Sequence, residues 1–206
     1  MKKTILLIVM WACASWTTAL AAAEPVILVM GDSLSAAYGI PADRGWVALL
    51  QARLQKNGSR ARVVNASVSG ETSSGGLARL PALLQKHQPR WVLIELGAND
   101  GLRGQPVKAM QANLGQMIEL ARAANARPVL FEMRIPSNYG PVYTEQFAAS
   151  FGRVAEATQT PLLPFFLAPI ALDASAFLDD GIHPGARAQP LLLDAVWPTL
   201  APLLRE

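Results

Sequence analysis

The stretch VILVMGDSLS, residues 26–35, places an unbroken aliphatic run directly before Gly31-Asp32-Ser33. A short run of this kind that ends in glycine is typical of a buried strand entering a loop. After it the spacing of apolar residues changes to about 3.6, from Trp46 to Leu54, which predicts a helix that ends near Asn57. The N-terminal part of the chain therefore indicates a strand followed by a helix.

The same alternation continues to the C-terminus. Apolar runs predict further strands at residues 62–66, 91–96, 128–133 and 162–166. Segments of helical spacing predict helices at residues 76–87, 107–124, 142–158 and from about 186 onward. The last of these contains Pro190, Pro198 and Pro202, so we expect it to be kinked or broken.

Short apolar strands that alternate with amphipathic helices imply parallel pairing, because each crossover between parallel strands needs a helix. We therefore predict an α/β fold, a three-layer α/β/α sandwich with a parallel sheet of about five strands and a flavodoxin-like topology. In such sheets the ligand site lies beyond the carboxyl ends of the strands. We therefore expect the functional residues in the loops that follow the first, second, third and fifth strands.

Residues 1–23 have the charged, apolar and small-residue parts of a secretory signal peptide, with cleavage expected after Ala21 or Ala23. A membrane anchor is the alternative, although the apolar run is short for a span of roughly twenty residues. Residues 24–206 are expected to form one domain. The protein is thus predicted to be secreted across the inner membrane, without stable membrane insertion after cleavage.

Composition excludes several functions for the mature part. Cys13 is the one cysteine of the chain and lies in the signal segment, which excludes disulfides and thiolate catalysis. Removing Lys2 and Lys3 lowers the formal charge from +3 to +1, and the remaining basic residues are scattered singly along the sequence. No nucleic-acid partner is therefore expected. Two histidines offer no metal-ligand cluster, so neither a metal nor a cofactor is predicted.

Ser33 and His183 are the candidate nucleophile and base. A serine hydroxyl needs a neighbouring base, and imidazole has a suitable pKa near neutrality. His183 lies in a loop bounded by Gly181 and Pro184, and Asp180 is spaced to reach the far ring nitrogen. Asp179 is the alternative acid. His87, at the end of a helix, is better explained as a solvent-exposed cap. Taken singly, Asp180 and His183 could each be residues that only stabilise a turn.

Four blocks of sequence then carry a specific resemblance: GDSLS (31–35), NASVSG (65–70), GANDGL (97–102) and DGIHP (180–184), with GLARLP (76–81) beside them. In this order they resemble the SGNH (GDSL) hydrolase superfamily, and within it the bacterial periplasmic thioesterases that also act as lysophospholipases and arylesterases. The resemblance implies catalysis by Ser33, Asp180 and His183. It also implies an oxyanion hole formed by the backbone N–H groups of Ser33 and Gly70 and the amide of Asn99, and hydrolysis of acyl thioesters and esters.

An acyl chain needs apolar surface beside the oxyanion hole. The predicted substrate-binding residues are apolar and lie in the right loops: Leu34, Leu102, Ile135, Tyr139 and Ile182. Packing within the core explains any one of them equally well. Two alternatives remain open, a carbohydrate O-acetylesterase of the same fold and a periplasmic protein that binds acyl chains without catalysis. The expected partner is a small ester or thioester substrate, and the expected oligomeric state is a monomer.

Overall fold

The structure is a computed structural model that describes residues 24–205. The predicted signal peptide, residues 1–23, lies outside the described residues. A sheet of five strands forms the centre, in the order β2-β1-β3-β4-β5, with every neighbouring pair parallel. The strands are β1 (Val26–Gly31), β2 (Arg62–Asn65), β3 (Trp91–Glu95), β4 (Arg127–Phe131) and β5 (Leu162–Leu163).

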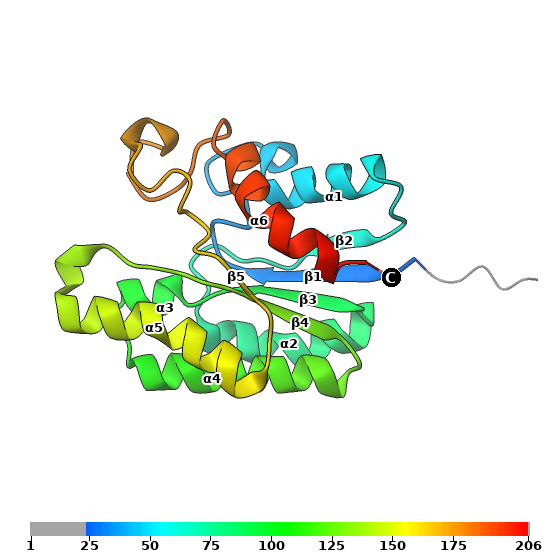
Figure 1. The fold of residues 1–206 in the computed structure, drawn as a ribbon, viewed down its shortest axis with the longest axis horizontal. Helices are drawn as coiled ribbons and strands as arrows, with labels where there is room; N and C mark the ends of the chain where they lie inside the picture. The colour runs from blue at the N-terminus through cyan, green and yellow to red at the C-terminus, as the bar shows by residue number, and fades with distance from the viewer. Residues whose placement is uncertain (1–23, 206) are drawn as a thin grey trace, which may run out of the picture.

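Helices cover both faces of this sheet (Figure 1). On one face lie α1 (Trp46–Lys56) and α6 (Gln189–Leu203), and on the other lie α2 (Ser73–His87), α4 (Val107–Ala123) and α5 (Pro141–Thr158). The remaining helical segments are short: η1 (Ala42–Arg44), α3 (Ala98–Leu102), η2 (Ser137–Tyr139) and η3 (Ala174–Ala176). The predicted three-layer α/β/α sandwich with a parallel sheet is confirmed.

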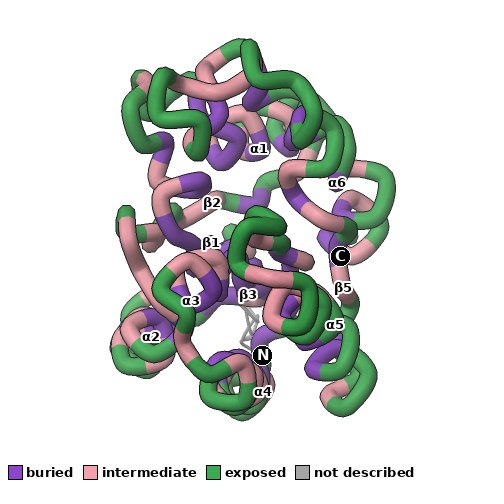
Figure 2. The backbone as a smooth tube through the Cα atoms, turned by 90° about the vertical axis from the view of Figure 1, so that its left-hand side faces the viewer, coloured by how far each residue is buried: buried purple, intermediate pink, exposed green. Residues whose placement is uncertain are grey.

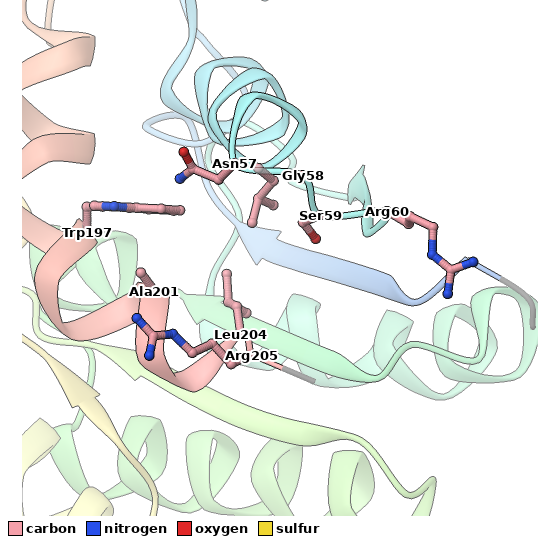
Figure 3. Close-up of a pocket in the computed structure, with 9 residues that line it drawn as sticks. Asn57, Gly58, Ser59, Arg60, Trp197, Ala201, Leu204 and Arg205 are labelled. Carbon is pink, nitrogen blue, oxygen red and sulfur yellow. The ribbon is translucent and has the colours of Figure 1, made fainter.

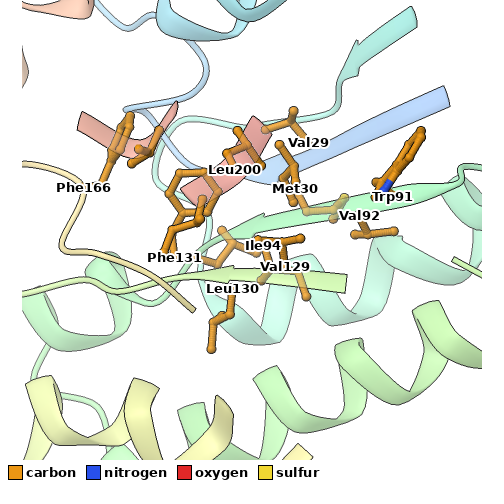
Figure 4. Close-up of a cluster of buried hydrophobic side chains, with 14 of the residues drawn as sticks. Val29, Met30, Trp91, Val92, Ile94, Val129, Leu130, Phe131, Phe166 and Leu200 are labelled. Carbon is orange, nitrogen blue, oxygen red and sulfur yellow. The ribbon is translucent and has the colours of Figure 1, made fainter. Parts of the chain in front are cut away.

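The core lies on both faces of the two central strands. Every residue of β1 and β3 is buried, as a sheet covered on both sides requires. Figure 4 shows aliphatic side chains of these strands beside Phe131 of β4 and Leu200 of α6. The rings of Trp46, Phe131 and Phe166 pack against one another with centroids 5.2 to 5.5 Å apart. Burial of each such side chain contributes about 1.5–3 kcal/mol to folding.

The structure differs from the sequence-based predictions at two places in the C-terminal part. The strand expected at residues 162–166 is only Leu162–Leu163, because Pro164 has no N–H to donate to the ladder. The last helix is unbroken from Gln189 to Leu203. Pro190 lies in its first turn, where no intrahelical donor is needed, and the buried side chains of Leu193, Val196 and Leu200 hold the rest of the helix in place.

Differences also occur near the loops at the carboxyl ends of the strands. Helix α2 begins at Ser73, three residues earlier than expected, because the Thr72 side chain caps it by accepting from the backbone N–H of Gly75 at 3.3 Å. The residues after β3, expected to be a loop, form the one-turn helix α3. Asn99 is therefore held on a helical turn. No helix within residues 24–205 has the length and apolar character needed to span a membrane.

Candidate active site

The strand order brings the functional loops together at one edge of the sheet. β1 is flanked by β2 on one side and β3 on the other, so the chain leaves β1 and β3 on opposite faces. The crevice at such a switch point is the usual ligand site of a parallel sheet. The carboxyl ends of the strands point to the left in Figure 1, and Figure 2 views this edge from the front.

Ser33 follows β1 on a tight turn. The backbone N–H of Ala36 donates to the carbonyl of Asp32 at 2.9 Å, and that of Tyr38 donates to the carbonyl of Ser33 at 3.1 Å. The side chain of Asp32 closes the start of the turn, because its Oδ1 accepts from the N–H of Leu34 at 3.0 Å. These hydrogen bonds place the half-buried Ser33 at the end of the strand with its hydroxyl facing the histidine loop.

Three side chains form a continuous chain of contacts. Ser33 Oγ lies 2.9 Å from His183 Nε2, and His183 Nδ1 lies 2.7 Å from Asp180 Oδ2. The other carboxylate oxygen of Asp180 accepts from the backbone N–H groups of Ile182 and His183, both at 2.9 Å. These hydrogen bonds from His183 and Ile182 lower the pKa of Asp180 to about 2, so the carboxylate stays charged at neutral pH. Asp180, and not Asp179, is therefore the acid against the imidazole.

The ring of Tyr38 lies against the imidazole of His183, with centroids 4.3 Å apart and planes tilted by 38°. The contact limits the orientations open to the imidazole, and half of the Tyr38 side chain remains exposed beside it. This residue was missed by the sequence analysis. Nothing in a tyrosine five residues after a serine indicates that it will meet a histidine 145 residues further on, so local sequence carries no signal for it.

The three groups expected to form an oxyanion hole are hydrogen-bond donors with capacity left for a ligand. The backbone N–H groups of Ser33 and Gly70 are not used by any hydrogen bond within residues 24–205. Gly70 has φ of +78°, a conformation that favours glycine over any other residue. Its carbonyl accepts from Arg103 Nη2 at 2.8 Å, which fixes the neighbouring peptide. Asn99 Nδ2 donates one hydrogen to Asp32 Oδ2 at 3.0 Å, and an amide nitrogen has a second N–H to offer.

Asp32 thus connects the turn that carries Ser33 to Asn99. One of its carboxylate oxygens accepts from the backbone N–H of Leu34, and the other accepts from the amide of Asn99. Only 1% of Asp32 is exposed, and burial is the main reason that its pKa is raised to about 6, against the lowering effect of the hydrogen bonds from Leu34 and Asn99 and of nearby His183. An ionised carboxylate at this position is costly for folding, and it is retained where it orients Asn99.

The five predicted substrate-binding residues differ in their exposure. Leu34 is 6% exposed and packs in the core, so it offers little surface to a ligand. Tyr139 is about a third exposed, and its hydroxyl donates to the carbonyl of Leu102 at 2.8 Å. Ile135 packs beside Gly101, and the half-exposed Ile182 precedes the histidine. Leu102, Ile135 and Tyr139 therefore lie near one another, and Ile182 is the neighbour of His183 in the chain.

Other features lie away from this edge. A cavity of about 540 Å³ opens between the ends of α1 and α6, near Asn57, Arg60, Trp197 and Arg205 (Figure 3). None of the predicted site residues lines it. His87 is the last residue of α2, at the end of a helix as the sequence predicted. Within residues 24–205, no group of three or more histidine, cysteine or acidic side chains is arranged to hold a metal ion.

Comparison with known proteins agrees with this geometry. Residues 29–190 match the model of the GDSL-like lipase/acylhydrolase family, a stretch that includes both Ser33 and His183. The chain belongs to this family of ester hydrolases, so the resemblance predicted from the four sequence blocks is confirmed.

Individual relatives are similar over nearly the whole chain. Esterase TesA of Pseudomonas aeruginosa is 53% identical over 183 residues, which cover 89% of this chain and 91% of the relative. Thioesterase 1/protease 1/lysophospholipase L1 of Escherichia coli is 49% identical over 186 residues, covering 90% and 88%. The crystal structure of the psychrotrophic esterase EstA from Pseudoalteromonas sp., inhibited by monoethylphosphonate, superposes with a TM-score of 0.85 at 46% identity, covering 89% of this chain and all of that one.

The raised pKa of Asp32 makes a prediction about stability. Since its folded-state pKa of about 6 lies above the ordinary value of 3.8, the stabilising effect of protonation is present below pH 4 and is lost as the pH rises through 6. Asp32→Asn has no such titration. We expect the free energy of unfolding of the variant, relative to wild type, to rise by about 2–3 kcal/mol between pH 4 and pH 7. Urea denaturation at both pH values measures this, and a difference independent of pH would contradict it.

Proposed function

We propose that this protein hydrolyses acyl thioesters and carboxylic esters through an acyl intermediate on Ser33. The observation that carries the proposal is the continuous contact from Ser33 Oγ through the imidazole of His183 to Asp180. An imidazole in this place can accept the hydroxyl proton as Ser33 attacks, and the carboxylate favours the tautomer with a free Nε2 and stabilises the imidazolium that forms. These are the parts that acyl transfer to a serine requires.

In the first half of the reaction, Ser33 Oγ attacks the acyl carbonyl carbon while its proton passes to His183 Nε2. The tetrahedral oxyanion is stabilised by the N–H groups of Ser33 and Gly70 and by the amide of Asn99, each worth about 3 kcal/mol of barrier. The intermediate collapses when the bond to the leaving alkoxide or thiolate breaks, and His183 returns the proton to it. In the second half, water attacks the acyl-serine by the same route and releases the free acid.

The substrate class is supported by the relatives and by the apolar residues at the site. The relatives at about 50% identity are an esterase and a thioesterase that is also a lysophospholipase. The apolar surface of Leu102, Ile135 and Tyr139, which lie near one another, and of Ile182, next to His183, is suited to an acyl chain. We therefore propose medium-to-long-chain thioesters, aryl esters and lysophospholipids as substrates.

We also propose that residues 1–23 direct export and that residues 24–206 are the mature, single-domain and monomeric enzyme of the periplasm. The charged, apolar and small-residue parts of the N-terminal segment support export, and the supply of every proposed catalytic group by one chain supports a monomer. The mass of the protein recovered from the periplasmic fraction should correspond to cleavage after Ala21 or Ala23. Recovery of the full-length chain in the membrane fraction would favour an anchor instead.

Variants of the two neighbouring aspartates test which acid orients His183. Asp180→Asn should lower kcat by about a thousandfold or more, because the imidazole loses the partner that sets its tautomer. Ser33→Ala and His183→Ala should lose activity to a similar extent. Asp179→Asn is the matched control, since it changes a neighbouring acid that does not contact His183, and it should keep kcat within about threefold. Equal losses in both aspartate variants would contradict the assignment.

The acyl-chain preference tests the substrate class. Steady-state hydrolysis of p-nitrophenyl esters from C2 to C16 should show kcat/KM rising with chain length and highest at C6 or longer, because each buried methylene contributes about 0.8 kcal/mol. A preference for acetate, together with activity on acetylated glycans, would instead support a carbohydrate O-acetylesterase. Absence of turnover with measurable acyl binding would support a binding protein.

A further inference from the structure

Glu95 is a fully buried carboxyl group that the proposed mechanism does not use. It is the last residue of β3 and pairs in register with Gly31 of β1, so it lies directly beneath the nucleophile turn. Its Oε2 accepts from the hydroxyl of Ser35 at 2.5 Å and from the backbone N–H of Asp32 at 3.4 Å. Glu95 therefore holds the residues on either side of Ser33 without touching Ser33 itself.

The contacts continue from Ser35 toward the histidine loop. Trp46 Nε1 donates to Ser35 Oγ at 3.1 Å, so the Ser35 hydroxyl donates its own hydrogen to Glu95. The backbone N–H of Trp46, at the start of α1, donates to Gln189 Oε1 at 3.0 Å. Gln189 in turn donates from Nε2 to the carbonyl of Pro184 at 3.2 Å, one residue beyond His183. All four side chains, those of Glu95, Ser35, Trp46 and Gln189, are at most 1% exposed.

We propose that Glu95 and Gln189 are positioning residues, the two ends of a buried relay Glu95–Ser35–Trp46–Gln189 that keeps the turn of Ser33 and the turn of His183 in register. The proposal rests on the proposed function in one respect, that the Ser33–His183 contact is the catalytic one. The contact joins segments 150 residues apart, and the relay is a further polar connection that reaches from one turn to the other.

Gly31 shows how closely the carboxyl group is fitted under the turn. A Cβ at Gly31 would lie 2.6 Å from Cβ of Ser35 and 2.7 Å from Oε2 of Glu95, closer than such atoms approach in proteins. The glycine of the Gly31-Asp32-Ser33 sequence therefore makes room for the Glu95–Ser35 hydrogen bond. Space for the carboxyl group requires that position 31 has no side chain, which favours a specific role for Glu95 over accidental burial.

The charge state of Glu95 determines which variant preserves the relay. Burial, and secondly the negative charge of Asp32, raise the pKa of Glu95 well above its usual range, which favours the neutral carboxyl. Because Oε2 accepts two hydrogen bonds, the proton belongs on Oε1, which has no hydrogen-bond partner within residues 24–205. Glutamine has the same shape with an oxygen in the place of Oε2, whereas leucine fills the space without an acceptor.

The test compares these variants by kcat and KM on a p-nitrophenyl ester that wild type hydrolyses. Glu95→Leu and Gln189→Met should each lower kcat by about ten- to a hundredfold with KM within about threefold, because a small displacement of reacting groups has large effects on rate. Glu95→Gln should restore kcat to within about threefold of wild type. The double variant Glu95→Leu/Gln189→Met should lose less than the product of the two single losses, since both act on one contact.

Ser150→Ala is the matched control for a structural effect. Ser150 is fully buried in α5, and its hydroxyl donates to the carbonyl of Phe147 at 2.6 Å, outside the relay. Its loss should lower Tm without lowering kcat. A folded Glu95→Leu variant whose kcat is within threefold of wild type would overturn the proposal. If Glu95→Leu does not fold, normal kcat in Gln189→Met would overturn it equally.

A second measurement separates the relay from the proposed function. In protein labelled with ¹⁵N-histidine, the ring-nitrogen signals of His183 report the contact with Ser33 without any substrate. These signals should shift in Glu95→Leu and Gln189→Met and stay unchanged in Glu95→Gln and Ser150→Ala. Shifts of this pattern in an inactive protein would retain the relay while rejecting ester hydrolysis. Unchanged His183 signals in folded Glu95→Leu and Gln189→Met would reject the relay.

Discussion

The hydrogen bond between Ser33 Oγ and His183 Nε2 is the contact on which the account of this protein depends. It joins the turn after the first strand to a loop near the C-terminus, across 150 residues of sequence. A parallel sheet makes this possible, because all strands end at the same edge and the loops that follow them share one crevice. The aliphatic core fixes the strands, and hydrogen bonds within and between the loops then bring serine and histidine together.

Buried polar groups near this edge carry a cost for the fold and a benefit for the site. Asp32 and Glu95 both have raised pKa values because they are buried among apolar strands. Replacing such groups commonly stabilises a protein. Their presence near Ser33 is explained by their contacts, because Asp32 holds the Asn99 amide and Glu95 holds Ser35. The site is thus built at the expense of local stability, in the part of the sheet where the core is otherwise apolar.

The sequence predicted the fold class and the residues with local signals. Ser33 followed a buried strand, and Asp180 and His183 stood three residues apart in a loop, so the contact between the last two could be predicted from spacing. Tyr38, Gln189 and the role of Glu95 were not predicted. The Ser35–Glu95 contact spans 60 residues and the Trp46–Gln189 contact spans 143, and such contacts depend on how the layers pack. Of these three, only Glu95 had a visible signal in the sequence, because it is the single charged residue of the otherwise apolar strand β3.

The most direct test of the central claim is to react the purified protein with a fluorophosphonate and to locate the adduct by peptide mass spectrometry. Such a reagent is attacked by an activated serine and leaves a stable phosphonyl ester on its oxygen. The account predicts one adduct per chain, on the peptide that contains Ser33, and none in Ser33→Ala. An adduct on Ser35 or Ser67, or a protein that hydrolyses esters while Ser33 stays unmodified, would contradict it.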